Sequence, residues 1–219
     1  MRNITAILMV VIILGCTTTE EPLKISTARQ VTEDNIFSYR SVHVKVNLNL
    51  NYLDISGNIK KNKKWDDPTK REFHIFTRPG INKIVSIEIH TRNRPHTFQG
   101  SQEDLTKNMA VIQKGSKPIG GRTWQVYTRA LPEFPEYVKS AISQKGISIE
   151  QYLCGLEIGV AGVIDRFSRI YISYIKGIEA CQTLPLNGST LSNKQLRMIR
   201  DFSSQFDENI TISVQSDGS

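Results

Sequence analysis

The chain has 219 residues, three cysteines and a formal net charge of +7. It contains no Gly-x-Ser-x-Gly, His-Glu-x-x-His, Walker or Gly-x-Gly-x-x-Gly motif, so the sequence indicates none of the enzyme classes that these motifs mark. The cysteines show no Cys-x-x-Cys spacing, which excludes the common redox motif.

The first sixteen residues have the order of an export signal. A single Arg2 precedes an apolar run at residues 4–14, and this run is too short for a transmembrane helix, which needs about 20 apolar residues. The run ends at Gly15-Cys16, and residues 13–16 resemble the lipobox of bacterial lipoproteins. The resemblance implies that residues 1–15 form a cleaved signal peptide and that Cys16 receives fatty acyl chains such as palmitate.

The same resemblance implies a place in the cell envelope. Thr17, rather than Asp, follows the cysteine, which implies the periplasmic face of the outer membrane in a host with two membranes. The mature chain loses only Arg2 among its charged residues and stays basic, so its screened field favours anionic lipid or wall components as neighbours. Nucleic acid is disfavoured as a partner because the chain is exported.

Residues 16–35 are polar, contain Pro22 and show no sustained hydrophobic period. This composition predicts a lipidated N-terminal tether. The remaining residues 36–219 have the length of one domain with a sizeable core, so a single domain is expected.

Alternating apolar and polar residues predict several strands in the body. The pattern is clear at residues 42–48, where valines and a leucine alternate with polar residues, and it recurs at 73–77 and 84–91. A further strand is expected at 122–129, introduced by Gly120-Gly121.

Residues 153–164 and 167–178 predict a long hairpin at the centre of the sheet. If residue 166 faces residue 169 across the turn, Cys154 lies opposite Cys181, and a shift of two residues makes the contact diagonal. Since export allows oxidation, the two cysteines are expected to form a disulfide.

Three helices are expected between and after the strands. The first covers about residues 102–113, and the second covers about 133–145. The third begins after Ser192, where apolar residues recur at helical spacing and predict a stripe that faces the core. Residues 209–214 add either an edge strand or a tail.

These elements together predict an α+β fold. Its sheet is mainly antiparallel, with a long central hairpin at about 153–178, and two or three helices cover it, including a C-terminal amphipathic helix. The element order resembles that of PsbP-like α+β proteins, which implies an accessory or assembly role and no catalytic residues to carry over.

His90, Arg92 and Arg94 form the one polar group with catalytic or ligand potential, with His74 and His96 nearby in the sequence. On an extended strand the three share a face and could bind an anionic group. The favoured interpretation is the solvent face of an amphipathic strand. No third ligand stands at a metal-binding spacing, so no metal or cofactor is expected.

Two functions remain open at this stage. The favoured one is a non-catalytic binding or assembly module that contacts a protein partner or wall component through the face of its sheet. The alternative is a small-ligand-binding or hydrolytic envelope protein that uses the strand with His90, Arg92 and Arg94.

Overall fold

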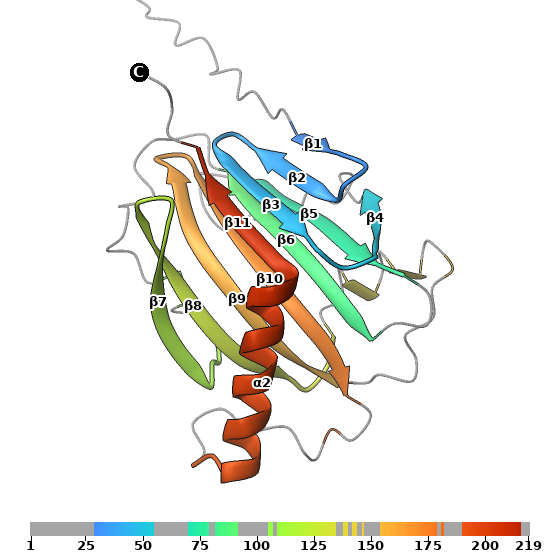
Figure 1. The fold of residues 1–219 in the computed structure, drawn as a ribbon, viewed down its shortest axis with the longest axis vertical. Helices are drawn as coiled ribbons and strands as arrows, with labels where there is room; N and C mark the ends of the chain where they lie inside the picture. Colours follow the sequence, from blue (N-terminus) through green and yellow to red (C-terminus); the bar gives the residue numbers. More distant parts are fainter. Residues whose placement is uncertain are drawn as a thin grey trace, which may run out of the picture.

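In the part of the chain that it describes, the computed structural model contains two antiparallel sheets and one long helix (Figure 1). Every strand pairing among the described residues is antiparallel, as the sequence predicts for most of the sheet. The structure describes residues 29–54, 70–78, 82–91, 105–106, 109–134, 138–139, 142–143, 146, 154–178, 181 and 190–215.

The larger sheet has seven strands in the order β4-β5-β6-β10-β9-β8-β7. The alternating sequence pattern correctly predicts β5, β6 and β8, whereas β4 and β7 were not expected. The Gly120-Gly121 pair, with φ of 55° and 73°, forms the two-residue turn between β7 and β8. The strands are β4 (Asn51–Asp54), β5 (Lys70–Thr77), β6 (Lys83–Thr91), β7 (Gln113–Ile119), β8 (Arg122–Leu131), β9 (Cys154–Asp165) and β10 (Ser168–Ile178).

The hairpin of β9 and β10 lies at the centre of this sheet, as the sequence predicts. β6 flanks β10 on one side, and β8 flanks β9 on the other. Nearly every residue of both strands is buried, because both faces of the sheet are covered in this region. Burial on both faces explains why the two strands appear in the sequence as almost continuous apolar runs.

The register of this hairpin differs from the predicted one. The structure pairs Asp165 with Ser168, instead of residue 166 with residue 169, and a bulge next to Ser168 shifts the register further along the strands. Cys154 therefore lies opposite Ile178 and not opposite Cys181. The predicted disulfide still forms, because Cys181 lies just beyond the end of β10 with its Cα atom 5.7 Å from that of Cys154.

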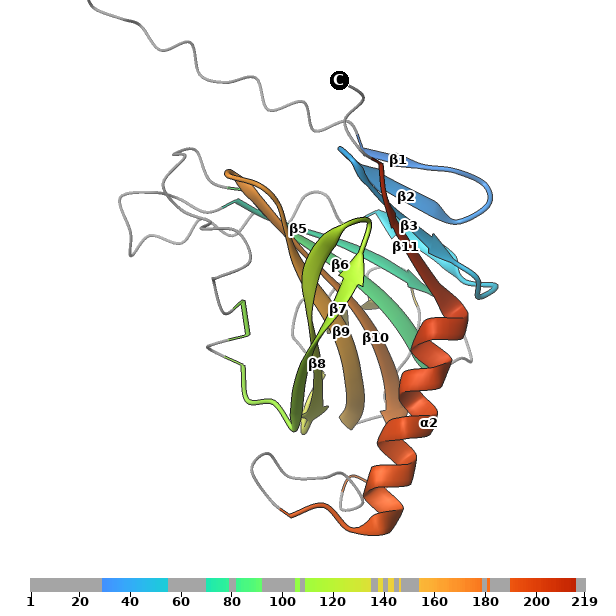
Figure 2. The same ribbon diagram turned by 60° about the vertical axis from the view of Figure 1, so that its left-hand side comes forward.

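The smaller sheet covers one face of the larger sheet (Figure 2). Its alternating side chains include Phe37 and Val44, which are fully buried against residues of the larger sheet such as Ile87 and Ile172. The prediction of β3 from residues 42–48 is confirmed, and of the two alternatives for residues 209–214 the edge strand is the one that forms. The strand order is β1 (Arg29–Val31), β2 (Ile36–Tyr39), β3 (Val42–Val46) and β11 (Ile210–Val214).

The helix α2 (Asn193–Asn209) covers the rest of that face and continues directly into β11. Ser192 caps its first turn, and the Gln195 side chain bonds back to the Ser192 backbone to complete a capping box. Ile199, Phe202 and Phe206 form the predicted apolar stripe, and all three are buried in the core.

The predicted α+β fold with a cover of two or three helices is wrong, because the described residues form mainly antiparallel strands in two sheets. The smaller sheet covers most of one face of the larger sheet, and α2 is the one long helix among the described residues. In the segment expected to be helical at 102–113, Leu105 and Thr106 form a turn and Gln113 already begins β7. The apolar spacing fitted a helix, but Leu105 packs on the sheet beside Tyr127, so tertiary contacts override the local period.

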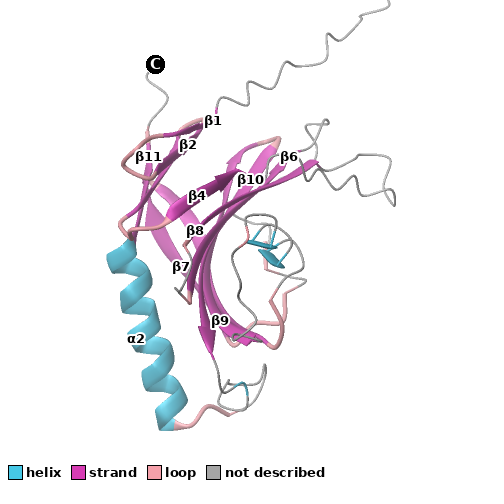
Figure 3. Ribbon diagram, turned by 90° about the vertical axis from the view of Figure 1, so that its right-hand side faces the viewer, coloured by secondary structure: helices cyan, strands magenta, loops and turns pink. Residues whose placement is uncertain are grey.

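The second face of the larger sheet is also covered (Figure 3). Residues 138–139 and 142–143 are helical, whereas residues 133–134 are not, so the helix expected at 133–145 is wrong at its start; residues 135–137, 140–141 and 144–145 lie outside the described residues. Val138 and Ile142 are fully buried against Phe73 of β5 and neighbouring strand residues. Both faces of the central strands are therefore removed from water.

The folded body begins earlier than the sequence predicts. β1 places residues 29–31 in the smaller sheet, although they belong to the tether expected at 16–35. Asn35 adopts a positive φ of 55°, and its side-chain amide donates to the carbonyl of Leu50. Cys16 lies outside the described residues. In the part of the chain that the structure describes, no helix has the length and apolar character needed to cross a membrane.

Candidate functional site

His90 is buried, so the predicted solvent face is wrong for this residue. Its side chain lies near the end of β6 and is 4% exposed. The alternation along β6 places Ile89 under the smaller sheet and His90 on the opposite face, which other segments cover. A period of two cannot show whether the second face of a strand meets water. Arg92, Arg94 and His96 lie outside the described residues.

The structure separates His74 from His90. The His74 ring lies with its centroid 4.6 Å from that of Phe37, which places it on the face under the smaller sheet. The residue of β5 that pairs with His90 is Arg71. These two histidines therefore do not form a common site.

His90 lies between a carboxylate and a guanidinium. Its Nε2 atom is 2.5 Å from Oε1 of Glu88, and its Nδ1 atom is 3.2 Å and 3.1 Å from Nε and Nη2 of Arg169. Since a guanidinium can only donate hydrogen bonds, Nδ1 accepts them, and Nε2 carries the proton that it donates to Glu88. This arrangement holds the imidazole as one neutral tautomer.

The ionisation of this cluster agrees with that tautomer. Burial lowers the pKa of His90 below 6.5, and the charges of Arg169 and Arg71 act in the same direction against the influence of Glu88. Burial by itself raises the pKa of Glu88, but its hydrogen bond to His90 and the nearby positive charges outweigh burial and lower the pKa below 4.5. Near neutral pH, His90 is uncharged and Glu88 is ionised.

A second buried cluster surrounds Glu157 on the same face. The Glu157 side chain is only 2% exposed, and its Oε1 atom accepts from Tyr127 at 3.0 Å and from Ser173 at 2.8 Å. Its Oε2 atom accepts from Nε of Arg129 at 2.6 Å. Burial raises the pKa of Tyr127 well above 10, and the Glu157 charge raises it further, so the phenol stays protonated as a donor.

Gly159 makes room for this second cluster. It pairs with Tyr127 across the β8–β9 ladder, and the tyrosine ring crosses the space above it to reach Glu157 and Ser173. A Cβ atom at residue 159 would lie 2.4 Å from Cζ and Oη of Tyr127. The backbone must therefore lack a side chain at this position for the hydrogen bonds to form.

The polar side chains of both clusters are paired with one another. Glu157 accepts from side chains of β8 and β10, whereas Glu88 bonds to His90 of its own strand and forms an ion pair with Arg71 of β5 at 3.8 Å. Among the described residues, no group of three His, Cys, Asp or Glu side chains could hold a metal ion. The chemistry of these residues is directed at one another, so a ligand site has to be sought elsewhere.

A groove of about 560 Å³ lies between α2 and the ends of β9 and β10 that are farthest from their connecting turn. Its floor is apolar, with Leu156 and Ile178 from the sheet and Met198 and Phe202 from the helix. This volume is within the range of small-molecule sites, about 300–1,000 Å³. The other lining residues are Asn82, Lys176, Gly177, Lys194, Arg197, Asp201 and Gln205.

Positive charge dominates the rim of this groove. Lys176, Lys194 and Arg197 line it together with one carboxylate, Asp201. None of the three cations forms an ion pair with a carboxylate among the described residues. The first turn of α2 contains no acidic residue, so the positive N-terminal end of the helix dipole adds to the same potential.

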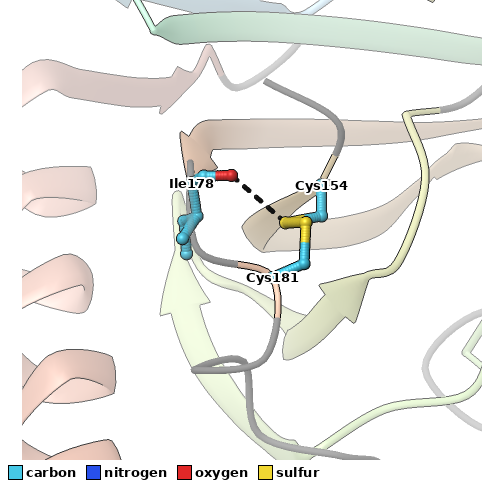
Figure 4. The surroundings of a disulfide bond; sticks show 3 residues. All are labelled: Cys154, Ile178 and Cys181. Carbon is cyan, nitrogen blue, oxygen red and sulfur yellow. Dashed lines mark hydrogen bonds between the residues drawn. A yellow bond between two sulfur atoms is a disulfide. The ribbon is translucent and has the colours of Figure 1, made fainter. Parts of the chain in front are cut away.

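The disulfide lies at the open end of the hairpin, away from the turn and next to the groove floor (Figure 4). Sγ of Cys154 is 3.2 Å from the carbonyl oxygen of Ile178, and because a disulfide sulfur carries no proton, this approach is a packing contact. Cys154 is fully buried. The bridge thus ties the start of β9 to the chain just beyond β10, beside the position where Ile178 forms part of the floor.

Sequence reasoning identified the groove residues only as members of separate elements. Lys194 and Arg197 were expected on the polar face of the C-terminal helix, opposite the core stripe, and Lys176 was part of a strand. Their convergence depends on a long-range contact that no local pattern reports. One sequence signal was present: carboxylates are favoured in the first turn of a helix, and this helix has a lysine there instead.

Comparison with known proteins assigns no family to the chain. No family model matches it, and no solved structure matches it. A segment of 76 residues is 26% identical to a beta-ketoacyl-[acyl-carrier-protein] synthase III of Thermosynechococcus vestitus. The match covers 32% of this chain and 23% of that protein, so the chain spans less than a quarter of the length of this relative.

Proposed function

We propose that this chain is a lipid-anchored protein of the bacterial envelope and that its folded body is a non-catalytic binding module. Acyl chains on Cys16 hold the body at the membrane, at the periplasmic face of the outer membrane in a host with two membranes. The body binds an envelope component in the groove beside α2.

The groove is the observation that carries the binding part of this proposal. A concave apolar floor with a few convergent polar groups is the usual form of a ligand site. Here the floor comes from β9, β10 and α2, and the rim holds cations without ion-pair partners among the described residues. The lipobox-like residues 13–16 support the anchor.

The buried polar clusters support a module without catalysis. A general acid or base has to reach the proton that it transfers on a bound substrate. His90 and Glu157 are each at most 4% exposed, and each bonds to an arginine of a neighbouring strand, Arg169 and Arg129 respectively. Their arrangement favours a structural role.

The groove also replaces the sheet face as the expected binding surface. Residues of the smaller sheet and α2 cover one face of the larger sheet, and Leu105, Phe134 and Val138 pack on the other. A partner that needed a sheet face would have to displace this cover. The groove is open without such a change.

Lipidation is tested by metabolic labelling of the precursor with palmitate. We expect the natural chain to incorporate the label and Cys16→Ser to incorporate none, since the acyl chains attach to that sulfur. Cys181→Ser, which also removes one thiol, should keep the label. Labelling that persists in Cys16→Ser, or that disappears in Cys181→Ser alone, contradicts the anchor at Cys16.

A further inference from the structure

The groove combines two features that one ligand class can satisfy. Its apolar floor, formed by Leu156, Ile178, Met198 and Phe202, buries hydrocarbon. Its rim presents Lys176 from the strand side and Arg197 from the helix side. A ligand complementary to both has a long apolar part and an anionic end.

The charged side chains on the rim indicate which kind of ligand group the groove can bind. Three cations, Lys176, Lys194 and Arg197, face the same groove as Asp201. The three cations outnumber Asp201, so the rim attracts an anionic group, and Asp201 weakens that attraction without reversing it. Arginine also fits a carboxylate through two parallel hydrogen bonds.

We propose that the groove binds a long-chain fatty acid, with the hydrocarbon chain on the apolar floor and the carboxylate at Lys194, Arg197 and Lys176. This inference rests on the proposed function, because it names the ligand class of the same groove. The position of α2 strengthens it: Lys194 and Arg197 stand near the positive end of the helix dipole, where their own charges are unfavourable without an anion.

Photolabelling with a diazirine analogue of palmitic acid tests the ligand class. The mature lipoprotein, with its disulfide intact, is placed in phosphatidylcholine vesicles, exposed to the probe and light, digested, and analysed by mass spectrometry. We expect adducts on peptides that contain Met198 or Phe202 of the helix and Ile178 of the sheet. Unlabelled palmitate should compete, and methyl palmitate, which carries no charge, should not.

Charge variants separate recognition from non-specific partition. Lys194→Glu combined with Arg197→Glu should reduce groove labelling about tenfold, the scale expected for lost charge-assisted contacts. Asp201→Asn should increase labelling severalfold, because it removes the repulsion. Arg200→Glu is the matched control, since Arg200 is exposed on the same helix but does not line the groove, and its labelling should equal that of the natural chain. Circular dichroism checks that each variant is folded.

Several outcomes overturn the inference. Adducts scattered over the surface, or equal competition by methyl palmitate, exclude recognition of an anionic acyl chain in the groove. Stronger competition by hexadecyl phosphate than by palmitate excludes the carboxylate. Loss of labelling in Arg200→Glu as great as in the double variant excludes a local charge effect. Failure of the anchor is distinguishable, because absent palmitate incorporation at Cys16 leaves groove labelling measurable on protein mixed with the same vesicles.

Discussion

The two faces of the larger sheet differ in whether their charged side chains have partners. On one face, Glu157 is buried and bonded to donors from adjacent strands, and the half-buried Glu88 is paired with His90 and Arg71. On the other face, beside α2, Lys176, Lys194 and Arg197 line an open groove and make no ion pair with a described carboxylate. The larger sheet therefore has paired charges on one face and a positively charged groove on the other.

The difference follows from solvation. An unpaired charge inside a sheet covered on both faces costs several kcal/mol, so it persists only with partners. An unpaired charge on a rim that stays in contact with water costs little free energy, because water solvates it, and it stays available to a ligand. Pairing on one face therefore serves stability, and the unpaired cations on the other face are available to the proposed ligand.

Removing Glu157 should break the buried side of this comparison most strongly. Glu157→Ala takes away the acceptor of Tyr127, Ser173 and Arg129, and we expect a loss of about 3 kcal/mol in the free energy of unfolding, measured with urea. Arg197→Ala, on the groove rim, should change this quantity by less than about 0.5 kcal/mol. Equal losses in the two variants would show that the two faces do not differ.

A methyl group at residue 159 should test the space above the hairpin. Gly159→Ala places a Cβ atom 2.4 Å from the Tyr127 ring, and we expect a loss of about 2 kcal/mol because the ring has to leave its hydrogen bonds or the strands have to separate. Gly115→Ala on β7 is the control, since no atom lies within 4 Å of its added Cβ. Thermal unfolding of both variants measures the difference.

The smallest expected effect concerns acid and the His90 cluster. The pKa of His90 is lower in the folded chain than the ordinary 6.5. As the pH falls, His90 is therefore protonated in the unfolded chain before it is protonated in the folded chain. The stabilising contribution of neutral His90 is complete above pH 6.5 and is lost as the pH falls toward its folded pKa. Glu88, whose pKa is also lowered, adds a further loss below pH 4.5.

Urea unfolding, measured at pH values from 7.5 to 5 in steps of about half a pH unit, checks how the free energy of unfolding depends on pH. His90→Gln should flatten the slope in this range, because it removes the group that titrates next to Arg169 and Arg71. His43→Gln is a suitable comparison, since His43 lies on β3 of the smaller sheet, away from these cations. A slope that His90→Gln leaves unchanged would remove His90 as its source.

The local pattern of apolar residues correctly predicted the elements that bury one side along their whole length. The alternation at Val42 to Val46 and the helical spacing of Ile199, Phe202 and Phe206 each describe an element with one buried side, and both predictions are confirmed. The helical spacing at residues 102–113 was misleading, because the described residues there form no helix: Leu105 and Met109 pack beside Tyr127, and Ile112 packs against the main core.

The sequence by itself determined the central hairpin and the C-terminal helix, since each follows from the period of residues near one another in the chain, and it indicated the disulfide between Cys154 and Cys181 although not the strand register beside it. The tertiary structure alone decided that a second sheet covers the first, that His90 is buried, and that Lys176 meets Arg197 across a groove. These features depend on which distant segments pack together, and the free energy of that packing is not expressed in any local period.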